Sequence, residues 1–206
     1  MFVSTHGIAS RPTVSGCTAV VGTNIQVGTG TSTDNRYPAY GLYDYSHQMF
    51  MYTSAQIGSG QKQITGISFN MASYTVPYTF LNQTLKLAHC TDVQFGTSVQ
   101  ILNTNGDISG VNGVTNLTTV KANFTWTINP NGWRTVNFDT NFCYNGTSTL
   151  LVIWENRDGS WTTGYGTAQT SVPTGFQSWY KEQDTTYPTG FGTRNSAKRP
   201  NIRLNY

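Results

Sequence analysis

The chain has 206 residues, of which only 10% are charged, and its formal net charge is +3. Average soluble proteins carry about 25% charged residues, and a nucleic-acid-binding protein usually shows a denser basic stripe, so no nucleic-acid partner is expected. No run of 18 apolar residues occurs, which excludes a conventional membrane span. Aromatic residues make up 13% of the chain, and they supply enough apolar surface for a folded core.

Residues 1–20 are polar and show no clear period, so we interpret them as an extended arm that precedes the domain. Phe2, Val3 and Arg11 are the residues of this arm that we expect to dock onto a partner. The first residues lack the basic and apolar regions of a secretory signal. The polypeptide is therefore expected either to be made and assembled in a cytoplasm or to be a mature form without its leader.

Residues 21–206 are predicted to form one domain of nine or ten short strands with almost no helix. In chain order, the predicted strands are 24–27, 48–53, 63–72, 84–90, 118–128, 133–138, 150–154, 161–166, 175–181 and 199–205. Residues 54–58 suit a single helical turn closed by Gly58, and Gly66 suits a β-bulge. The economical fold is an all-β, antiparallel two-sheet sandwich of jelly-roll type.

Three segments give more specific expectations. The alternation in 118–128, the turn at 129–132 and the alternation in 133–138 predict a hairpin. The continuous apolar run 150–154 predicts a central strand that is covered on both faces. Residues 91–117 are rich in Gly, Asn and Asp, and we expect exposed loops around one weak strand near 99–102.

The chain contains three cysteines, Cys17, Cys90 and Cys143, which are far apart in the sequence. They lack the spacing of a zinc site, and the histidines are scattered, so no metal or cofactor is expected. Buried free thiols are the first interpretation, and one disulfide with one free cysteine is the second.

Several segments together resemble a module that recurs in surface and secreted proteins of Bacteroidetes and in proteins of their phages. The segments that carry the resemblance are 28–33 (GTGTST), Tyr37-Pro38, 48–55, 64–69, 81–86, 132–133, 138–140, 142–148 and 199–204. The resemblance implies a β-sandwich used for adhesion, display or carbohydrate contact, and it brings no catalytic residues. A single module without a leader suits a virion protein better than a secreted adhesin.

Aromatic residues in turn-rich segments are the candidates for contact with a partner or a glycan, because their rings offer a large contact area and stack on sugars. These candidates are Tyr40, Tyr43, Tyr45, Tyr74, Tyr78, Trp161, Tyr165, Trp179 and Tyr187. Packing is an equally good explanation for the tyrosines, and Trp126, Trp133 and Trp154 are predicted to lie in the core. Glu155 and Asp158 could form a glycosidase pair in principle, but they lie across a turn, so no catalytic residue is predicted.

The preferred hypothesis is a non-enzymatic structural protein of a phage virion, such as a capsid decoration, spike or fibre-type subunit. Its expected partners are other virion proteins and copies of itself, with possible contact to a host-surface glycan. The alternative is a carbohydrate-binding or adhesin module of a bacterial surface or secreted protein.

Overall fold

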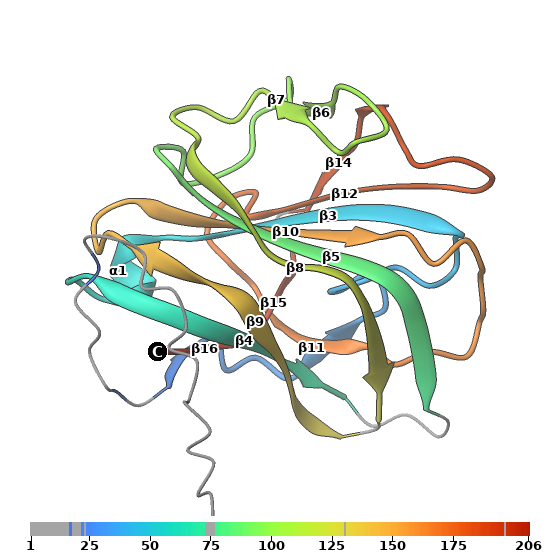
Figure 1. Ribbon diagram of the computed structural model, residues 1–206, viewed down its shortest axis with the longest axis horizontal. Helices are drawn as coiled ribbons and strands as arrows, with labels where there is room; N and C mark the ends of the chain where they lie inside the picture. The colour runs from blue at the N-terminus through green and yellow to red at the C-terminus, as the bar shows by residue number, and fades with distance from the viewer. Residues whose placement is uncertain (1–16, 18–21, 23, 73–76, 130, 196) are drawn as a thin grey trace, which may run out of the picture.

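The computed structural model describes residues 17, 22, 24–72, 77–129, 131–195 and 197–206. In these residues two antiparallel sheets pack face to face, and most of the connections between long strands pass from one sheet to the other (Figure 1). This confirms the predicted all-β sandwich. No helix of the described residues is long and apolar enough to cross a membrane.

The described strands form two large sheets and one small sheet. The first sheet contains β1 (Ile25–Val27), β2 (Ser32–Asp34), β4 (Lys62–Met71), β9 (Gly132–Tyr144), β11 (Ala168–Ser171), β15 (Arg199–Pro200) and β16 (Ile202–Asn205). The second sheet has the order β14 (Thr193–Asn195), β12 (Ser178–Gln183), β3 (Tyr45–Tyr52), β10 (Thr149–Asn156), β5 (Tyr78–Cys90) and β8 (Thr115–Ile128). The small sheet contains β13 (Gly190–Phe191), β6 (Gln100–Ile101) and β7 (Ile108–Ser109).

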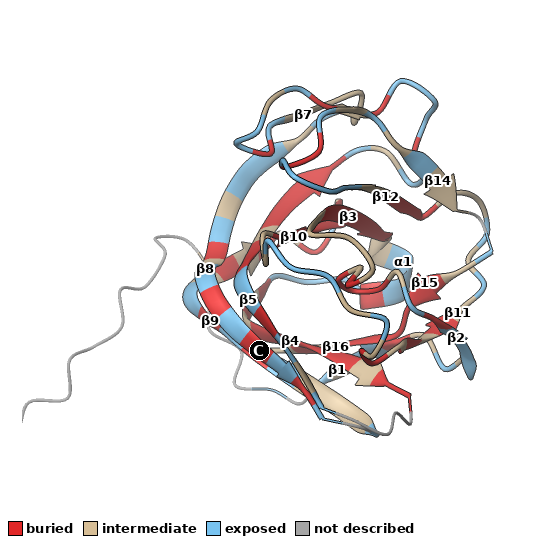
Figure 2. Ribbon diagram, turned by 90° about the vertical axis from the view of Figure 1, so that its right-hand side faces the viewer, coloured by how far each residue is buried: buried red, intermediate tan, exposed pale blue. Residues whose placement is uncertain are grey.

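The main core lies between the two large sheets and is built from alternate residues of their strands, and Figure 2 shows this alternation of buried and exposed residues along β8. Phe69 of β4 meets Trp154 of β10 edge to face, with ring centroids 5.5 Å apart, and Trp126 packs against Trp154 at 4.8 Å. Both tryptophans are buried, as predicted. Trp133 is only half-buried, because it lies on β9 at the edge of its sheet. The guanidinium of Arg203 lies over its ring, 4.1 Å from the ring centre.

The second sheet is also covered on its outer face, which makes this part of the molecule three layers deep (Figure 1). Residues 91–114, together with β13, fold over this face, and we call them the cap. Phe95, Val99 and Ile101 of the cap are buried against the outer side chains of β3, β5, β10 and β12. The prediction that 91–117 would form exposed loops is therefore only partly correct, because the cap buries a second apolar cluster.

Three predictions about single elements are confirmed. Strand β10 lies between β3 and β5 with all eight residues buried, as its apolar run predicts. The helical turn α1 (Ser54–Ile57) ends at Gly58 with φ +87°, and the β4–β9 register shifts between Ile64 and Gly66, so both of these predictions are confirmed.

Two predictions about strands are wrong, one about which strands pair and one about where a strand lies. The described residues of β8 and β9 do not form a hairpin, because β8 pairs with β5 and β9 pairs with β4 in the other sheet. Alternation fixes which face of a strand is apolar, but it does not fix the strand's neighbour. Residues 161–166 form a loop rather than a strand, and the next strand begins at Ala168.

A disulfide joins Cys17 to Cys143 of β9 across 126 positions of sequence, while Cys90 is a buried free thiol. Free thiols were the first interpretation for all three cysteines, so that interpretation is wrong for two of them and the second interpretation is correct. Pairing over such a distance depends on the sheet that brings β9 to the end of the predicted arm. Burial, helped by the nearby Asp92, raises the pKa of the Cys90 thiol to about 12.

Candidate functional site

Seven of the nine predicted contact aromatics lie in four segments that meet at one end of the sandwich, the right-hand end in Figure 1. We call this region the aromatic end, and it consists of residues 37–45, 78–81, 156–166 and 184–187. The seven residues are Tyr40, Tyr43, Tyr45, Tyr78, Trp161, Tyr165 and Tyr187. They come from distant parts of the sequence, so their common location is a result of the fold.

Backbone hydrogen bonds hold the loops of the aromatic end together. The Gly159 N–H donates to the Asp44 carbonyl at 2.9 Å, and the Thr162 N–H donates to the Gly41 carbonyl at 2.8 Å. The Asp44 N–H in turn donates to the Asp184 carboxylate at 3.3 Å. Three separate loops therefore form one connected surface.

The aromatic residues differ greatly in exposure. Trp161 is 61% exposed, and Tyr40, Tyr43, Tyr45 and Tyr78 are half-buried. Trp161 therefore offers the most exposed aromatic ring of this end.

Tyr165 and Tyr187 are buried, so their predicted contact role does not fit this structure. The ring of Tyr165 packs edge to face on Phe80, with centroids 6.0 Å apart. The Tyr187 hydroxyl lies 2.8 Å from Nδ1 of His47, and the guanidinium of Arg157 covers its ring at 3.6 Å. Both rings consolidate the loops, as the packing interpretation allowed.

Trp179 lies away from the aromatic end. It is on β12 beneath the cap, is 1% exposed and approaches His47 with ring centroids 5.9 Å apart, so its ring offers no surface to a ligand. Tyr74, Phe2, Val3 and Arg11 lie outside the described residues.

Tyr180 of β12 belongs to the same surface but was missed in the sequence. Its ring lies 6.5 Å from that of Tyr40, which in turn lies 5.3 Å from Tyr43. The guanidinium of Arg36 covers Tyr180 at 5.1 Å and is held by Asp34 through bonds of 2.8 and 2.6 Å. Only the alternation along β12 could have indicated that Tyr180 points away from the cap, on the opposite side from Trp179.

A hydrogen-bond network that begins in the buried core fixes the loop that carries Trp161. The Tyr78 hydroxyl donates to Asp158 at 2.8 Å, and the backbone N–H of Leu81 donates to the same carboxylate at 3.2 Å. The Asp158 N–H donates to Asn156 Oδ1, which also accepts from Gln83. Burial, with a contribution from Asp158, raises the pKa of Tyr78 to about 12, so this hydroxyl stays protonated and donates its hydrogen bond at neutral pH.

Glu155 and Asp158, the two carboxylates considered as a catalytic pair, are both engaged by protein groups. Glu155 is buried and forms ion pairs with Lys86 at 2.5 Å and with Arg157 at 2.9 Å. Asp158 accepts the two hydrogen bonds described above. Across the described residues, no three His, Cys, Asp or Glu side chains gather as a metal site would require.

Comparison with known proteins adds no relationship, since no family model, curated protein or solved structure matches the chain. The resemblance to the module of Bacteroidetes and their phages therefore stays a prediction. Any function must be argued from the aromatic end and from the rest of the surface.

Proposed function

We propose that the protein is a non-enzymatic β-sandwich module that contacts carbohydrate through its aromatic end. The observation that carries this proposal is the indole of Trp161, which is 61% exposed on a loop that partly buried hydrogen bonds hold in place. A large exposed indole costs solvation free energy, and a loop fixed in advance reduces the entropy lost on binding.

The surroundings of Trp161 suit a sugar better than an apolar ligand. Half-buried tyrosines present both a ring and a hydroxyl, and the loops carry the carboxylates of Asp44 and Asp184 with exposed serine and threonine residues. Aromatic rings stack on the C–H faces of sugars, while hydroxyl and carboxylate groups bond to the sugar hydroxyls.

A glycan array with the wild-type chain and Trp161→Ala tests this proposal. Phe191→Ala is the matched control, because Phe191 is also an exposed aromatic, at 60%, but lies on β13 of the cap. We expect Trp161→Ala to weaken glycan binding about tenfold or more and Phe191→Ala to leave it unchanged. Absence of wild-type binding to any glycan, or equal binding by Trp161→Ala, would overturn the proposal.

We also propose that the module is displayed on an exposed surface. Disulfides persist on virion and cell surfaces and are rare in reducing cytosol, so the Cys17–Cys143 bond favours an exposed location. It also ties the end of the predicted arm covalently to β9, which would give an arm a fixed base for docking to a neighbour. We favour a virion subunit, with a bacterial surface or secreted protein as the alternative.

Mass spectrometry of purified phage particles tests the location. A virion subunit should be present at a stoichiometry that matches a symmetric site of the particle. Its absence from particles, together with its recovery from the bacterial cell surface, would favour the alternative.

A further inference from the structure

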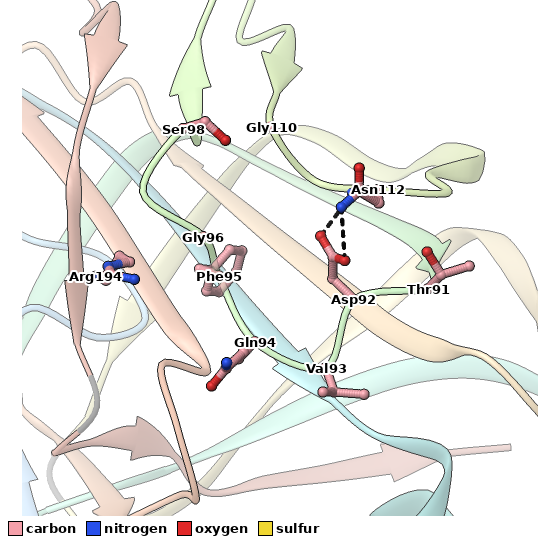
Figure 3. A pocket seen from close by; sticks show the side chains of 10 residues that line it. All are labelled: Thr91, Asp92, Val93, Gln94, Phe95, Gly96, Ser98, Gly110, Asn112 and Arg194. Atoms are coloured by element: carbon pink, nitrogen blue, oxygen red, sulfur yellow. Dashed lines mark hydrogen bonds between the residues drawn. The ribbon is translucent and has the colours of Figure 1, made fainter.

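The outer side of the molecule has an open hollow between the cap and β14, which we call the cap hollow (Figure 3). Its volume is about 440 Å³, and its wall combines the 91–98 segment, Gly110, Asn112 and Arg194. Pockets for small molecules occupy about 300–1,000 Å³, so a sugar unit or two would fit. The cap hollow shares no residue with the aromatic end.

Arg194 is the cation of the cap hollow. An aromatic ring holds its side chain, and no described carboxylate forms an ion pair with it. Its β14 position pairs directly with Trp179 of β12, which places the Arg194 side chain on the cap side of the sheet. The central carbon of the guanidinium lies over the Phe176 ring, 4.1 Å from the ring centre. Among the described residues, Arg194 forms no ion pair and no side-chain hydrogen bond. The stack occupies one face of the guanidinium, and its N–H edge is left for a ligand.

Asp92, the carboxylate in the wall, forms no ion pair with Arg194 among the described contacts. It accepts hydrogen bonds from the Asn112 backbone N–H at 2.8 Å and from the Asn112 side-chain amide at 3.0 Å, so its oxygens are directed toward Asn112 (Figure 3). Asp92 keeps its negative charge, so a ligand carboxylate is expected at Arg194, on the side of the hollow away from Asp92 (Figure 3).

A second cation lies behind the wall. Arg199 is 3% exposed, and its described hydrogen-bond acceptors are neutral: the Met51 carbonyl and the side-chain oxygens of Gln56 and Gln177. The Gln177 amide also donates to the Val93 carbonyl at 3.1 Å, so it connects Arg199 to the wall. A buried charge without a counter-ion acts over a longer range than an exposed one, and it adds to the preference for an anion.

The remaining groups of the wall suit hydroxyls. Gln94 and Ser98 are exposed and present an amide and a hydroxyl, each of which can both donate and accept. Gly96 leaves its part of the wall open, because a Cβ built there has only the Ser98 hydroxyl oxygen nearby, at 4.0 Å. We infer that the cap hollow binds a carboxylate-bearing saccharide, with Arg194 holding the carboxylate and Gln94 and Ser98 contacting the ring hydroxyls.

This inference does not depend on the glycan contact proposed for the aromatic end. A guanidinium binds a carboxylate through two parallel N–H bonds, a geometry that an amide or an ammonium group does not reproduce. Carboxylate saccharides should therefore bind, and the same saccharides with esterified carboxylates should bind far more weakly.

The test is an NMR titration of the full chain with trigalacturonate, with its methyl ester and with acetate. We expect trigalacturonate to shift the amide signals of Gln94, Gly96 and Ser98, with about tenfold weaker binding of the ester. Acetate, which offers the charge without the ring, should bind at least tenfold more weakly than trigalacturonate. Signals of Trp161 report separately on the aromatic end.

Three variants sharpen the test. Arg194→Gln should weaken trigalacturonate binding about tenfold or more, and Gly96→Phe should block it by filling the hollow. Arg203→Gln is the matched control, because its guanidinium also stacks at 4.1 Å, on Trp133, but belongs to the other sheet. It should leave binding unchanged.

Four results would overturn the inference. They are no shift of the hollow signals at millimolar trigalacturonate, shifts confined to Trp161, unchanged affinity in Arg194→Gln, and equal affinity for acetate. Shifts at Trp161 alone would still agree with the proposed function, so the two proposals can fail separately.

Discussion

Gln83 of β5 and Asn156 of β10 lie directly opposite each other, and the Gln83 amide donates a 2.6 Å hydrogen bond to Asn156 Oδ1. Gln83 also accepts a 2.6 Å bond from the indole N–H of Trp154, and all three residues are fully buried. Asn156 passes the connection on to the Asp158 N–H. A satisfied buried network of this kind favours one arrangement of its neighbours, so the core sets the position of the loop that carries Trp161.

Replacement of Gln83 by Leu should lower the free energy of unfolding by about 2–4 kcal/mol. The change leaves the Trp154 N–H without its acceptor and removes a donor from Asn156, and each buried unsatisfied group costs about 1–3 kcal/mol. Urea unfolding followed by tryptophan fluorescence measures this loss. Gln183→Leu, at an exposed position of β12, should change stability by no more than about 0.5 kcal/mol. A loss below about 1 kcal/mol in Gln83→Leu would show that the network adapts.

Glu155 attaches the cap to the sandwich through its two cations. Lys86 and Arg157 bind Glu155, and the same cations donate to carbonyls of the cap, Lys86 to Asn105 at 3.5 Å and Arg157 to Thr104 at 3.0 Å. Removal of one member of a buried ion pair costs about 3–5 kcal/mol, because it leaves an uncompensated charge. We expect Glu155→Gln to lower the free energy of unfolding by a value in that range.

The ion pair between Lys121 and Asp139 provides the control for Glu155. Its N–O distance is 2.9 Å, but the Asp139 side chain is 67% exposed, so Asp139→Asn should cost no more than about 1 kcal/mol. Hydrogen exchange gives a second readout. Glu155→Gln should speed exchange at the Leu102 amide, which bonds to the Asp107 carbonyl within the cap, whereas Asp139→Asn should not. Equal effects of the two variants would contradict the role of Glu155.

The sequence indicates which faces of a strand are buried better than it indicates which strands lie next to each other. The buried strand 150–154 could be predicted, because a continuous apolar run requires cover on both faces. The residues that provide this cover could not be predicted. Phe95, Val99 and Ile101 are separated by polar and Gly-containing segments, and they become buried only when the whole segment folds back. The pairing of β8 and β9 was predicted wrongly for the same reason, since it depends on long-range packing.

The candidate site could be predicted only in part, for a similar reason. The loop aromatics Tyr40, Tyr43, Tyr78 and Trp161 stood out by composition, and the structure brings them to one end. Trp179 and Tyr187 stood out equally but are buried. Their burial depends on the cap and on His47, which come from distant segments, and no local pattern reveals such contacts.

The Cys17–Cys143 disulfide should stabilise the folded chain by about 2–4 kcal/mol, because it restricts the unfolded state. We expect Cys143→Ser to lose this amount in urea unfolding, and Cys90→Ala to keep the disulfide. Alkylation followed by mass spectrometry counts the thiols. The native chain should take up no label at Cys90, the denatured chain one label, and the denatured and reduced chain three. Two or more labels before reduction would contradict the disulfide.

His47 is fully buried on β3 in a group of polar side chains beneath the cap. Its Nδ1 lies 2.8 Å from the Tyr187 hydroxyl, and its direct neighbours across the sheet are Glu155 and Lys181. Burial, with the nearby charges of Lys86 and Arg157, lowers the pKa of His47 from 6.5 to about 3. The imidazole is therefore neutral in the folded protein at any pH above that value.

Stability should fall as the pH is lowered from about 6.5 toward 3, because the unfolded chain then binds a proton at His47 that the folded chain excludes. One such group gives a slope of up to about 1.4 kcal/mol per pH unit. The difference in unfolding free energy between wild type and His47→Gln, measured by urea unfolding from pH 3.5 to 8, isolates this slope from that of the carboxylates. His89→Gln serves for comparison, since burial also lowers the pKa of His89. A constant difference between wild type and His47→Gln over this range would mean that His47 takes up its proton at the same pH in the folded and the unfolded chain, which would contradict the lowered pKa.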